Sequence, residues 1–322
     1  MPPGGRVDRD GRPGRRRAGA EGLVTTAART AGATPTTLAA ALDLAVERLV
    51  AAGIGEAAAR DDARLLAAHA VRVTPDDLDG QLRGPVPADL WTYVERRAAR
   101  EPAERIVGHA WFMGRRFELA PGVFVPKPET AEIVDDAVNR LHGLFQAGIR
   151  SPLVVDLCAG PGTMAVSIAR RVPQARVYGI ELAQAAVRVA VRNAHGTGAK
   201  IVQGDARDAF PELDGTVDLV VTNPPYIPIG LRTSSPEVLN YDPPLALWAG
   251  EGGLQMIRAM ELTASRLLRP GGVVLLEHGG YQLESVPRLF AGTGRWSAAA
   301  SRPTCNDGCL TAVRGEVSGR AL

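Results

Sequence analysis

The sequence predicts an α/β protein with a doubly wound, mostly parallel sheet, preceded by a small N-terminal helical domain. Three observations lead to this prediction. From residue 153 onward, short runs rich in Val, Ile and Leu alternate with helical patterns, as in a parallel sheet with crossover helices. Between residues 34 and 104 the apolar residues instead repeat at helical spacing. The segment 105–130 contains β-type residues and predicts a β-hairpin linker between the two patterns.

The residue pattern of the helical domain, residues 34–104, predicts four helical segments. The first begins with Thr34-Pro35 as its cap and first turn, and Gly53 and Gly55 separate it from the second. The second helix ends before Thr74-Pro75, and shorter helices follow at 76–81 and 88–100. The domain holds no cluster of catalytic side chains, so we expect it to recognise or position a substrate.

The remaining elements form the linker and the α/β domain, residues 131–317. In the linker, residues 107–112 and 117–119 predict the two strands of the hairpin. The α/β domain begins with a helix at 131–144 and closes with a second hairpin. Between them we expect strands and helices at these ranges: strands 153–157, 176–181, 200–202, 217–222 and 273–277; helices 164–171, 183–193, 254–268 and 282–290.

Composition and charge narrow the class of protein. The chain has 322 residues, of which 45% are hydrophobic and 22% charged, as in an ordinary globular protein. Residues 1–20 carry six arginines against two aspartates, so the net charge of +2 leaves the rest of the chain at −2. Such a body lacks a broad basic face, which weighs against nucleic acid as the main substrate. Residues 1–33, rich in Pro, Gly and Arg, predict a disordered, solvated tail.

The cysteines and the hydropathy pattern indicate a cytoplasmic protein. Cys158, Cys305 and Cys309 show no disulfide framework, which fits a reducing compartment. Cys305 and Cys309 are spaced C-x3-C without a partnering Cys or His pair nearby, so we predict no metal site. No apolar stretch approaches the ~20 residues of a membrane span, and no secretory signal is evident. We therefore expect no membrane partner.

The predicted strand 217–222 ends at Asn223-Pro224-Pro225-Tyr226. Proline cannot donate to a sheet ladder, so the strand stops at the carboxyl edge, where open α/β sheets bind ligands. The Asn223 side-chain oxygen and the Pro224 carbonyl are two acceptors beside an aromatic ring. They suit a planar group that bears an NH2, such as an amide or the exocyclic amine of a base. The alternative for the tetrapeptide alone is an ordinary turn at the end of a strand.

A second set of residues predicts a cofactor site. The strand 153–157 runs into a loop with Gly160 and Gly162, in which Pro161 removes an N–H that a pyrophosphate would need. Glu181, at the tip of the next strand, can accept two hydrogen bonds from a ribose diol. Asp205 and Ala206 are expected to contact adenine. Asp156 is expected to support the loop backbone and to contact the amine of the methionine. Sugar and adenine without phosphate describe S-adenosylmethionine.

These motifs together resemble those of a known family. They are D-L-C-A-G-P-G (156–162), G-I-E-L, G-D-A, V-T-N-P-P-Y-I-P, V-F-V-P-K-P-E-T (123–130) and P-G-G-V-V-L-L-E-H-G. Over residues 36–315 the sequence resembles the release-factor glutamine methyltransferases, the PrmC/HemK family of class I S-adenosylmethionine-dependent methyltransferases. The resemblance implies a seven-stranded sheet, a hairpin-linked helical domain, and methylation of the Gly-Gly-Gln glutamine of peptide chain release factors in the cytoplasm, by a monomer.

The resemblance also assigns residues. The family's cofactor loop falls on Cys158, Ala159, Gly160, Pro161 and Gly162, its ribose-binding acid on Glu181, its adenine-side position on Ala206, and its substrate motif on Asn223–Tyr226. Three features depart from the family pattern: Lys127 stands where an Arg is usual, Ala159 and Pro161 occupy positions where small or hydroxyl residues are usual, and the Cys305–Cys309 tail differs.

The resulting hypothesis is that Asn223 and Pro224 accept both hydrogens of a substrate NH2 while Tyr226 packs against the group. The alternatives are a glutamine methyltransferase for a ribosomal or other protein, an N6-adenine methyltransferase acting on nucleic acid, and a non-catalytic module that retains the fold. An adenine methyltransferase needs a positively charged base-flipping surface, which the near-neutral body lacks in bulk.

Overall fold

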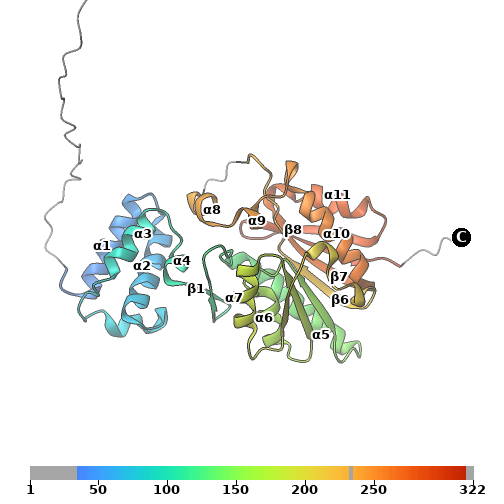
Figure 1. Ribbon diagram of the computed structural model, residues 1–322, viewed down its shortest axis with the longest axis horizontal. Helices are drawn as coiled ribbons and strands as arrows, with labels where there is room; N and C mark the ends of the chain where they lie inside the picture. Colours follow the sequence, from blue (N-terminus) through green and yellow to red (C-terminus); the bar gives the residue numbers. More distant parts are fainter. Residues whose placement is uncertain (1–34, 232–234, 317–322) are drawn as a thin grey trace, which may run out of the picture. The chain divides into compact units, whose positions relative to one another are not determined.

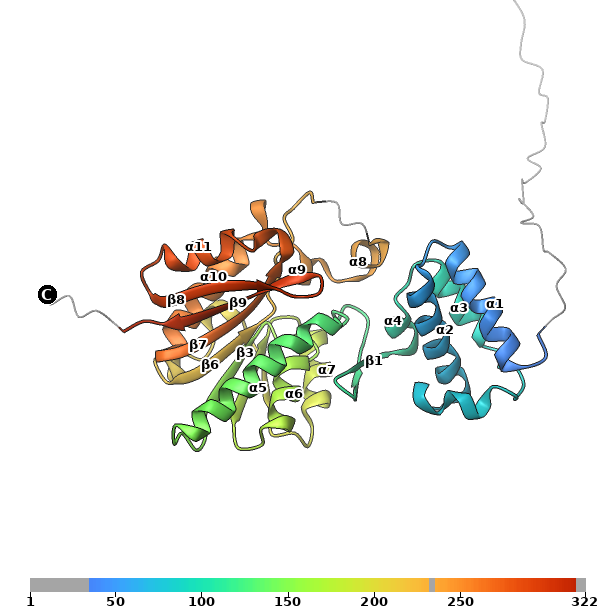
Figure 2. The same ribbon diagram turned by 180° about the vertical axis from the view of Figure 1, so that it is seen from behind.

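The computed structural model describes residues 35–231 and 235–316. The arginine-rich segment 1–33, which we predict to be a disordered tail, lies outside the described residues, as do Thr34 and Val317. Figures 1 and 2 show the chain from two opposite sides.

The N-terminal helices form around an apolar core of their own. The prediction of a start at Thr34-Pro35 is wrong: Pro35 precedes the helix, and Thr37 is the cap, with its Oγ accepting from the Ala40 N–H at 3.3 Å. Leu66 and Leu90 are fully buried in the core. The helices are α1 Leu38–Ala51, α2 Glu56–Val71, α3 Leu90–Ala98 and α4 Ala103–Val107, with a 3₁₀ helix Pro75–Gln81; α4 was not predicted.

The predicted hairpin is confirmed. Strands β1 (His109–Phe112) and β2 (Arg115–Glu118) pair antiparallel, with His109 opposite Glu118. Asn193 joins this hairpin to the α/β part: its Oδ1 accepts from the Glu118 N–H at 2.9 Å, and its Nδ2 donates to the Pro161 carbonyl at 2.9 Å. Asn193 is 4% exposed, so a buried amide links the hairpin to the predicted cofactor loop.

The sheet has seven strands in the order β5-β4-β3-β6-β7-β9-β8. The first five of this order are parallel, and β7-β9 and β9-β8 are antiparallel, which confirms the predicted fold class. β7 starts earlier than predicted because Leu268 already pairs with Val217 before a register shift. The strands are β3 Leu153–Leu157, β4 Arg176–Glu181, β5 Lys200–Gln203, β6 Val217–Thr222, β7 Leu268–Gly279, β8 Trp296–Pro303 and β9 Asp307–Arg314.

Helices cover both faces of the sheet (Figures 1 and 2). Successive residues of a strand point to opposite faces: Val154 belongs to the apolar cluster that includes residues of α5 and α6, whereas Val155 belongs to the cluster that includes residues of α10 and α11. Both are fully buried, which explains the uninterrupted apolar runs of these strands. The helices of this part are α5 Ala131–Gln146, α6 Thr163–Arg171, α7 Gln184–Ala194, α8 Pro236–Tyr241, α9 Pro244–Leu247, α10 Gln255–Leu267 and α11 Ser285–Ala291.

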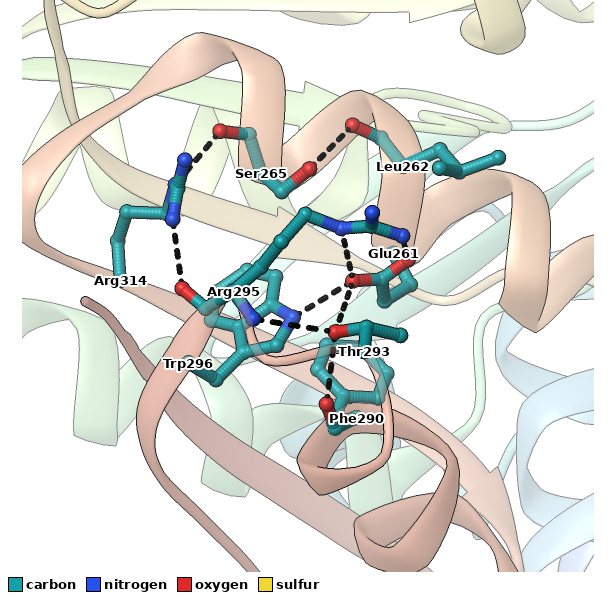
Figure 3. Close-up of polar contacts among 8 residues, drawn as sticks. All are labelled: Glu261, Leu262, Ser265, Phe290, Thr293, Arg295, Trp296 and Arg314. Atoms are coloured by element: carbon teal, nitrogen blue, oxygen red, sulfur yellow. Dashed lines mark hydrogen bonds and ion pairs between the residues drawn. The ribbon is translucent and has the colours of Figure 1, made fainter. Parts of the chain in front are cut away.

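A buried carboxylate fixes α10 against the far end of the sheet (Figure 3). Glu261, 2% exposed, accepts from both Nε and Nη2 of Arg295, from the Trp296 indole at 2.7 Å and from Thr293. Burial alone would raise the pKa of Glu261, but these donors hold the pKa below its ordinary value. The carboxylate therefore stays ionised and keeps α10 in place, which bears on the cavity described next.

Candidate active site

A cavity of about 610 Å³ lies at the carboxyl ends of β3, β4, β5 and β6. This is the edge at which open α/β sheets bind ligands. Most of the residues that the sequence predicts for cofactor and substrate meet there. Those on the cavity wall are Cys158, Ala159, Gly160 and Pro161 after β3, Glu181 at the end of β4, Asp205 and Ala206 after β5, and Asn223 and Pro225 after β6.

The loop after β3 is shaped by backbone conformations that few residues adopt. Gly160 and Gly162 have φ of 56° and 84°, and Cys158 has φ of 63°. A Cβ at Gly162 would lie 3.3 Å from the Cβ of Ala190, so a side chain would be tightly packed against α7 as well as strained by the positive φ. Gly162 thus acts in packing rather than at the cavity surface. The loop backbone is held by Glu181, whose Oε2 accepts from the Gly160 N–H at 2.8 Å.

Glu181 is a fixed acceptor at the cavity. Its second oxygen, Oε1, accepts from the Ala183 N–H at 2.7 Å, so both oxygens have one protein donor each. Burial raises the pKa of Glu181, against the effect of these backbone donors. A carboxylate oxygen has two lone pairs, so each oxygen can still accept from a hydroxyl in the cavity. This arrangement fits the ribose diol that we predict for Glu181.

Asp156 lies in β3, just before the loop, and is not among the residues of the cavity wall. It is 0% exposed, and its Oδ2 accepts from the Ala165 N–H at 2.9 Å in the first turn of α6. Burial raises its pKa to about 8. Asp156 is not among the residues that line the cavity, and its side-chain hydrogen bond supports α6 directly after the loop, so its roles toward the loop and a methionine amine stay predictions.

Two buried oxygens near the loop have no partner among the described residues, Asp156 Oδ1 and Thr163 Oγ1. Buried polar atoms are rarely left unsatisfied. Thr163 lines the cavity beside Cys158–Pro161, so its hydroxyl is available to a polar group of a bound molecule. The Thr163 hydroxyl, the acceptor oxygens of Glu181 and the absence of an N–H at Pro161 together fit S-adenosylmethionine, which has hydroxyls and an amino-acid end but no phosphate.

Asp205 and Ala206 form the wall after β5. The Arg207 guanidinium hydrogen-bonds to the Asp205 carboxylate and holds its pKa below the ordinary value, and the Arg207 N–H also donates to Oδ1 at 2.9 Å. Ala206 is 5% exposed and presents a small apolar surface to the cavity. The side chain of Asp205 is therefore oriented by Arg207, and it keeps acceptor capacity for an adenine amino group.

The amide of Asn223 is oriented by a carboxylate that the sequence analysis missed. Asn223 Nδ2 donates to Glu277 Oε1 at 2.7 Å and lies 3.5 Å from Thr130 Oγ1. Thr130 in turn donates to Glu277 Oε2 at 2.8 Å. Glu277 and Thr130 are 2% and 6% exposed. Since the amide nitrogen is directed at Glu277, the oxygen of Asn223 is the group left to accept from a substrate.

Glu277 could have been found from the strand pattern. Glu277 directly follows the apolar run Val273–Leu276, just as Asn223 directly follows β6. β6 and β7 are parallel, with Thr222 paired with Leu276, so the next residues of both strands are neighbours. Burial raises the pKa of Glu277 to about 7, although both hydrogen bonds act to lower it.

Tyr226 is anchored from the side away from the cavity. Its hydroxyl donates to Asp307 Oδ2 at 3.0 Å, and its carbonyl accepts from the Tyr281 hydroxyl at 2.7 Å. Pro225 lines the cavity, whereas Pro224 and Tyr226 lie beside it. Burial, with the negative charges of Glu277 and Asp307, raises the pKa of Tyr226 well above its ordinary value, so the phenol stays neutral. These contacts fix the backbone that carries Asn223.

Much of the rest of the wall is apolar, and part of it comes from the hairpin linker, from the segment after β6 and from α10. Its residues include Phe124, Pro126, Pro243, Leu245, Trp248 and Met256. The wall is joined to the substrate motif by backbone: the Ile227 N–H donates to the Leu247 carbonyl at 2.9 Å, and the Ala249 N–H donates to the Ile227 carbonyl at 2.9 Å. An apolar wall beside the held oxygen of Asn223 suits a flat aromatic group or the stem of an amide side chain.

Neither a metal centre nor a membrane span is found in the part of the chain that the structure describes. Within residues 35–231 and 235–316, no group of three or more His, Cys, Asp or Glu side chains is placed to hold a metal ion. Cys305 is exposed, whereas Cys309 is buried in the core. Among the described helices, none has the length and apolar character required to cross a bilayer.

Two family models match the chain, one described as the PrmC N-terminal domain, over residues 40–108, and one as a methyltransferase domain, over residues 154–229. The chain is 75% identical over 278 residues to a 4-amino-L-phenylalanine/4-methylamino-L-phenylalanine methyltransferase of Streptomyces pristinaespiralis, covering 86% of this chain and 95% of the relative. It is 43% identical to the release factor glutamine methyltransferase of Streptomyces coelicolor, covering 82% and 92% of the two chains.

The same activity is named for a relative from Mycolicibacterium smegmatis, which is 39% identical and matches 83% of this chain and 93% of its own length. These identities extend over nearly the full length of each relative, through both the helical region and the sheet. The chain belongs to the PrmC/HemK family of S-adenosylmethionine-dependent methyltransferases.

Proposed function

We propose that this protein transfers methyl groups from S-adenosylmethionine to the aromatic amino group of a free amino acid of the 4-aminophenylalanine type. The 75% identity to a relative named for that activity, against 43% for a release factor methyltransferase, supports this substrate. Lys127 stands where an arginine is usual in the release-factor enzymes, and a change of substrate would explain this departure.

The observation that carries the proposal is the hydrogen bond between Asn223 and Glu277. Because Glu277 holds the amide nitrogen of Asn223, the amide oxygen serves as an acceptor at the cavity. An aromatic amine has a planar or nearly planar NH2 whose lone pair is partly delocalised, as in a carboxamide. Asn223 Oδ1 and the Pro224 carbonyl can take its two hydrogens, which orients the nitrogen lone pair out of the plane of the ring.

S-adenosylmethionine supplies an electrophilic methyl carbon on a sulfonium, and the electrons of the broken C–S bond stay on sulfur. The role of the chain is to fix the nitrogen and to stabilise the positive charge that develops on it. The oxygens of Asn223 and Pro224 are preorganised for that charge, since Glu277 and the two prolines prevent their rotation. The methylated nitrogen then loses one proton to water and needs no buried base.

The relative is named for two successive substrates, the amine and the methylamine. A second methylation by this protein requires that one acceptor be sufficient, because the methylamine retains a single N–H. The apolar wall with Phe124, Leu245 and Trp248 provides a surface against which the first methyl group can pack. We therefore include the methylamine among the proposed substrates.

A second candidate is the glutamine of the Gly-Gly-Gln tripeptide in release factors. The match of residues 40–108 to the PrmC N-terminal domain favours it, as do the relatives at 43% and 39% identity. The amide of glutamine offers the same two hydrogens to Asn223 and Pro224, so the local chemistry is shared.

An assay that offers 4-aminophenylalanine, 4-methylaminophenylalanine, a release factor and an adenine-containing oligonucleotide in parallel tests the proposal. We expect methyl transfer to both amines, detected as mass increases of one and two methyl groups. Methylation of the release factor alone would establish the second candidate instead, and methylation of the oligonucleotide alone would exclude both.

A further inference from the structure

A buried ion-pair network connects the N-terminal helices to α8. Glu237, in the first turn of α8, accepts from Arg97 Nη1 through Oε1 at 2.9 Å and from Arg100 Nη2 through Oε2 at 2.9 Å. Arg97 also donates from Nε to Asp62 Oδ2, on α2, at 2.7 Å. Each oxygen of Glu237 thus receives its own arginine, and Arg97 lies between two carboxylates.

The network is shielded from water. The side chains of Arg97, Glu237 and Asp62 are 8%, 15% and 17% exposed. Burial alone would raise the pKa of Glu237, but hydrogen bonds from its own N–H and from the two arginines bring the pKa below its ordinary value. Salt screens such partly buried pairs much less than exposed ones, and loss of one member leaves charges without partners.

α8 is continuous with the outer wall of the cavity. It ends at Tyr241, and the side chain of the next residue, Asp242, is 2% exposed and lies 3.8 Å from Lys127 Nζ. The next residues, Pro243 and Leu245, line the cavity, and Trp248 follows on the same wall. At the other end of this segment, Trp248 and Ala249 pair with Ile227, which directly follows the substrate motif. Between these fixed ends, the wall contains only the four-residue helix α9.

The position of the wall therefore depends on what holds α8. Besides Glu237, Tyr241 contributes a hydroxyl that lies 3.4 Å from the Ala99 carbonyl, at the end of α3. A six-residue helix has too few hydrogen bonds to be stable by itself, so these contacts with the N-terminal helices help to set its place, together with the pair between Asp242 and Lys127.

We infer that the N-terminal helical region, through Arg97 and Arg100, positions the α8–α9 wall of the cavity by means of Glu237, and that Glu237 is a positioning residue for the amine substrate. The inference rests on the proposed function for the identity of that substrate. It gives the helical region a role that is needed even when the substrate is a free amino acid, too small to require a recognition domain.

Glu237→Gln tests the inference with two readouts. Hydrogen exchange of the ligand-free protein should speed up in a peptide that covers residues 242–249, where the Ala249 N–H bonds to Ile227, and should stay unchanged in α6 and β3. The KM for 4-aminophenylalanine should rise roughly tenfold, with kcat within about twofold, because the substrate motif itself is intact. Glu237→Asp, which keeps the charge, should fall between Gln and wild type.

Glu56→Gln is the matched control, because it breaks an exposed pair with Arg60 in the same helical region. It should change neither readout. Arg100→Gln, which leaves the pair between Arg97 and Glu237 intact, should change both readouts in the same direction as Glu237→Gln but by a smaller amount. It can replace Glu237→Gln in the test if that variant folds poorly.

Unchanged exchange in residues 242–249 of Glu237→Gln would overturn the inference, as would exchange that rises equally throughout the sheet. If the wild-type protein fails to methylate the amine, the proposed function is wrong, and the exchange comparison still decides whether Glu237 positions the wall.

Discussion

The side-chain nitrogen of Asn223, directly after β6, donates at 2.7 Å to Oε1 of Glu277, which lies in the neighbouring parallel strand β7. This contact decides which atom of Asn223 can meet a substrate. Thr130 supports the same carboxylate from the start of α5, so three segments far apart in the chain fix one amide.

Replacement of Asn223 by Ala removes the acceptor for one N–H of the substrate. We expect turnover to fall roughly a hundredfold, since loss of one preorganised hydrogen bond in the transition state costs about 3 kcal/mol. Calorimetry should show cofactor affinity changed much less. Near-normal methylation by Asn223→Ala would exclude the mechanism.

The activity should depend on the ionisation of Glu277. Its pKa is raised by burial to about 7, and only the ionised form accepts from both Asn223 and Thr130. Protonation below that pH gives Glu277 an O–H that competes for the oxygen of Asn223, so kcat/KM should fall as the pH decreases through about 7. In Glu277→Gln, which keeps an acceptor for Asn223, this part of the pH profile should be flat.

The same group affects folding stability with the opposite sign. Because the pKa of Glu277 is higher in the folded protein than its ordinary value of 4.5, the stability that it contributes is present below that value and is lost as the pH rises through about 7. Relative to wild type, Glu277→Gln should therefore gain stability between pH 5 and 8 in urea unfolding. If wild type instead became more stable relative to Glu277→Gln as the pH rises from 5 to 8, the raised pKa of Glu277 would be contradicted.

Glu181 should govern cofactor affinity. Glu181→Ala removes the acceptors for the ribose and also frees the Gly160 and Ala183 N–H groups. We expect S-adenosylmethionine to bind at least about tenfold more weakly in calorimetry, as for the loss of a charged hydrogen bond. Glu284→Ala, which breaks an exposed pair with Arg288, is the control and should bind like wild type.

Lys127 offers a test of amino-acid recognition. Its ammonium lies 5.5 Å from the ring centroid of Phe124, on the cavity wall, and its side chain is 33% exposed. We expect it to attract the carboxylate of a free amino acid, so Lys127→Met should raise the KM for 4-aminophenylalanine severalfold. The KM for 4-methylaniline, which has no carboxylate, should not change. Equal increases in KM for both amines would show that Lys127 does not bind the carboxylate and instead acts by holding the cavity wall through Asp242.

Much of this site follows from the chain alone. The apolar runs that end at Asn223 and Glu181, and the loop around Gly160, predict the sheet, its ligand-binding edge and the cofactor, because each depends on residues close together in the sequence. A strand can be recognised from its own residues, and its carboxyl end is known as soon as its direction is known.

The tertiary structure decided which distant side chains meet. Glu277 lies 54 residues from Asn223, and Glu237 lies 140 residues from Arg97. Such pairs depend on strand register and on the packing of helices, which local patterns do not encode. For the same reason the sequence places Asp156 next to the predicted cofactor loop, but only the fold shows that Asp156 is fully buried and that its Oδ2 holds the first turn of α6.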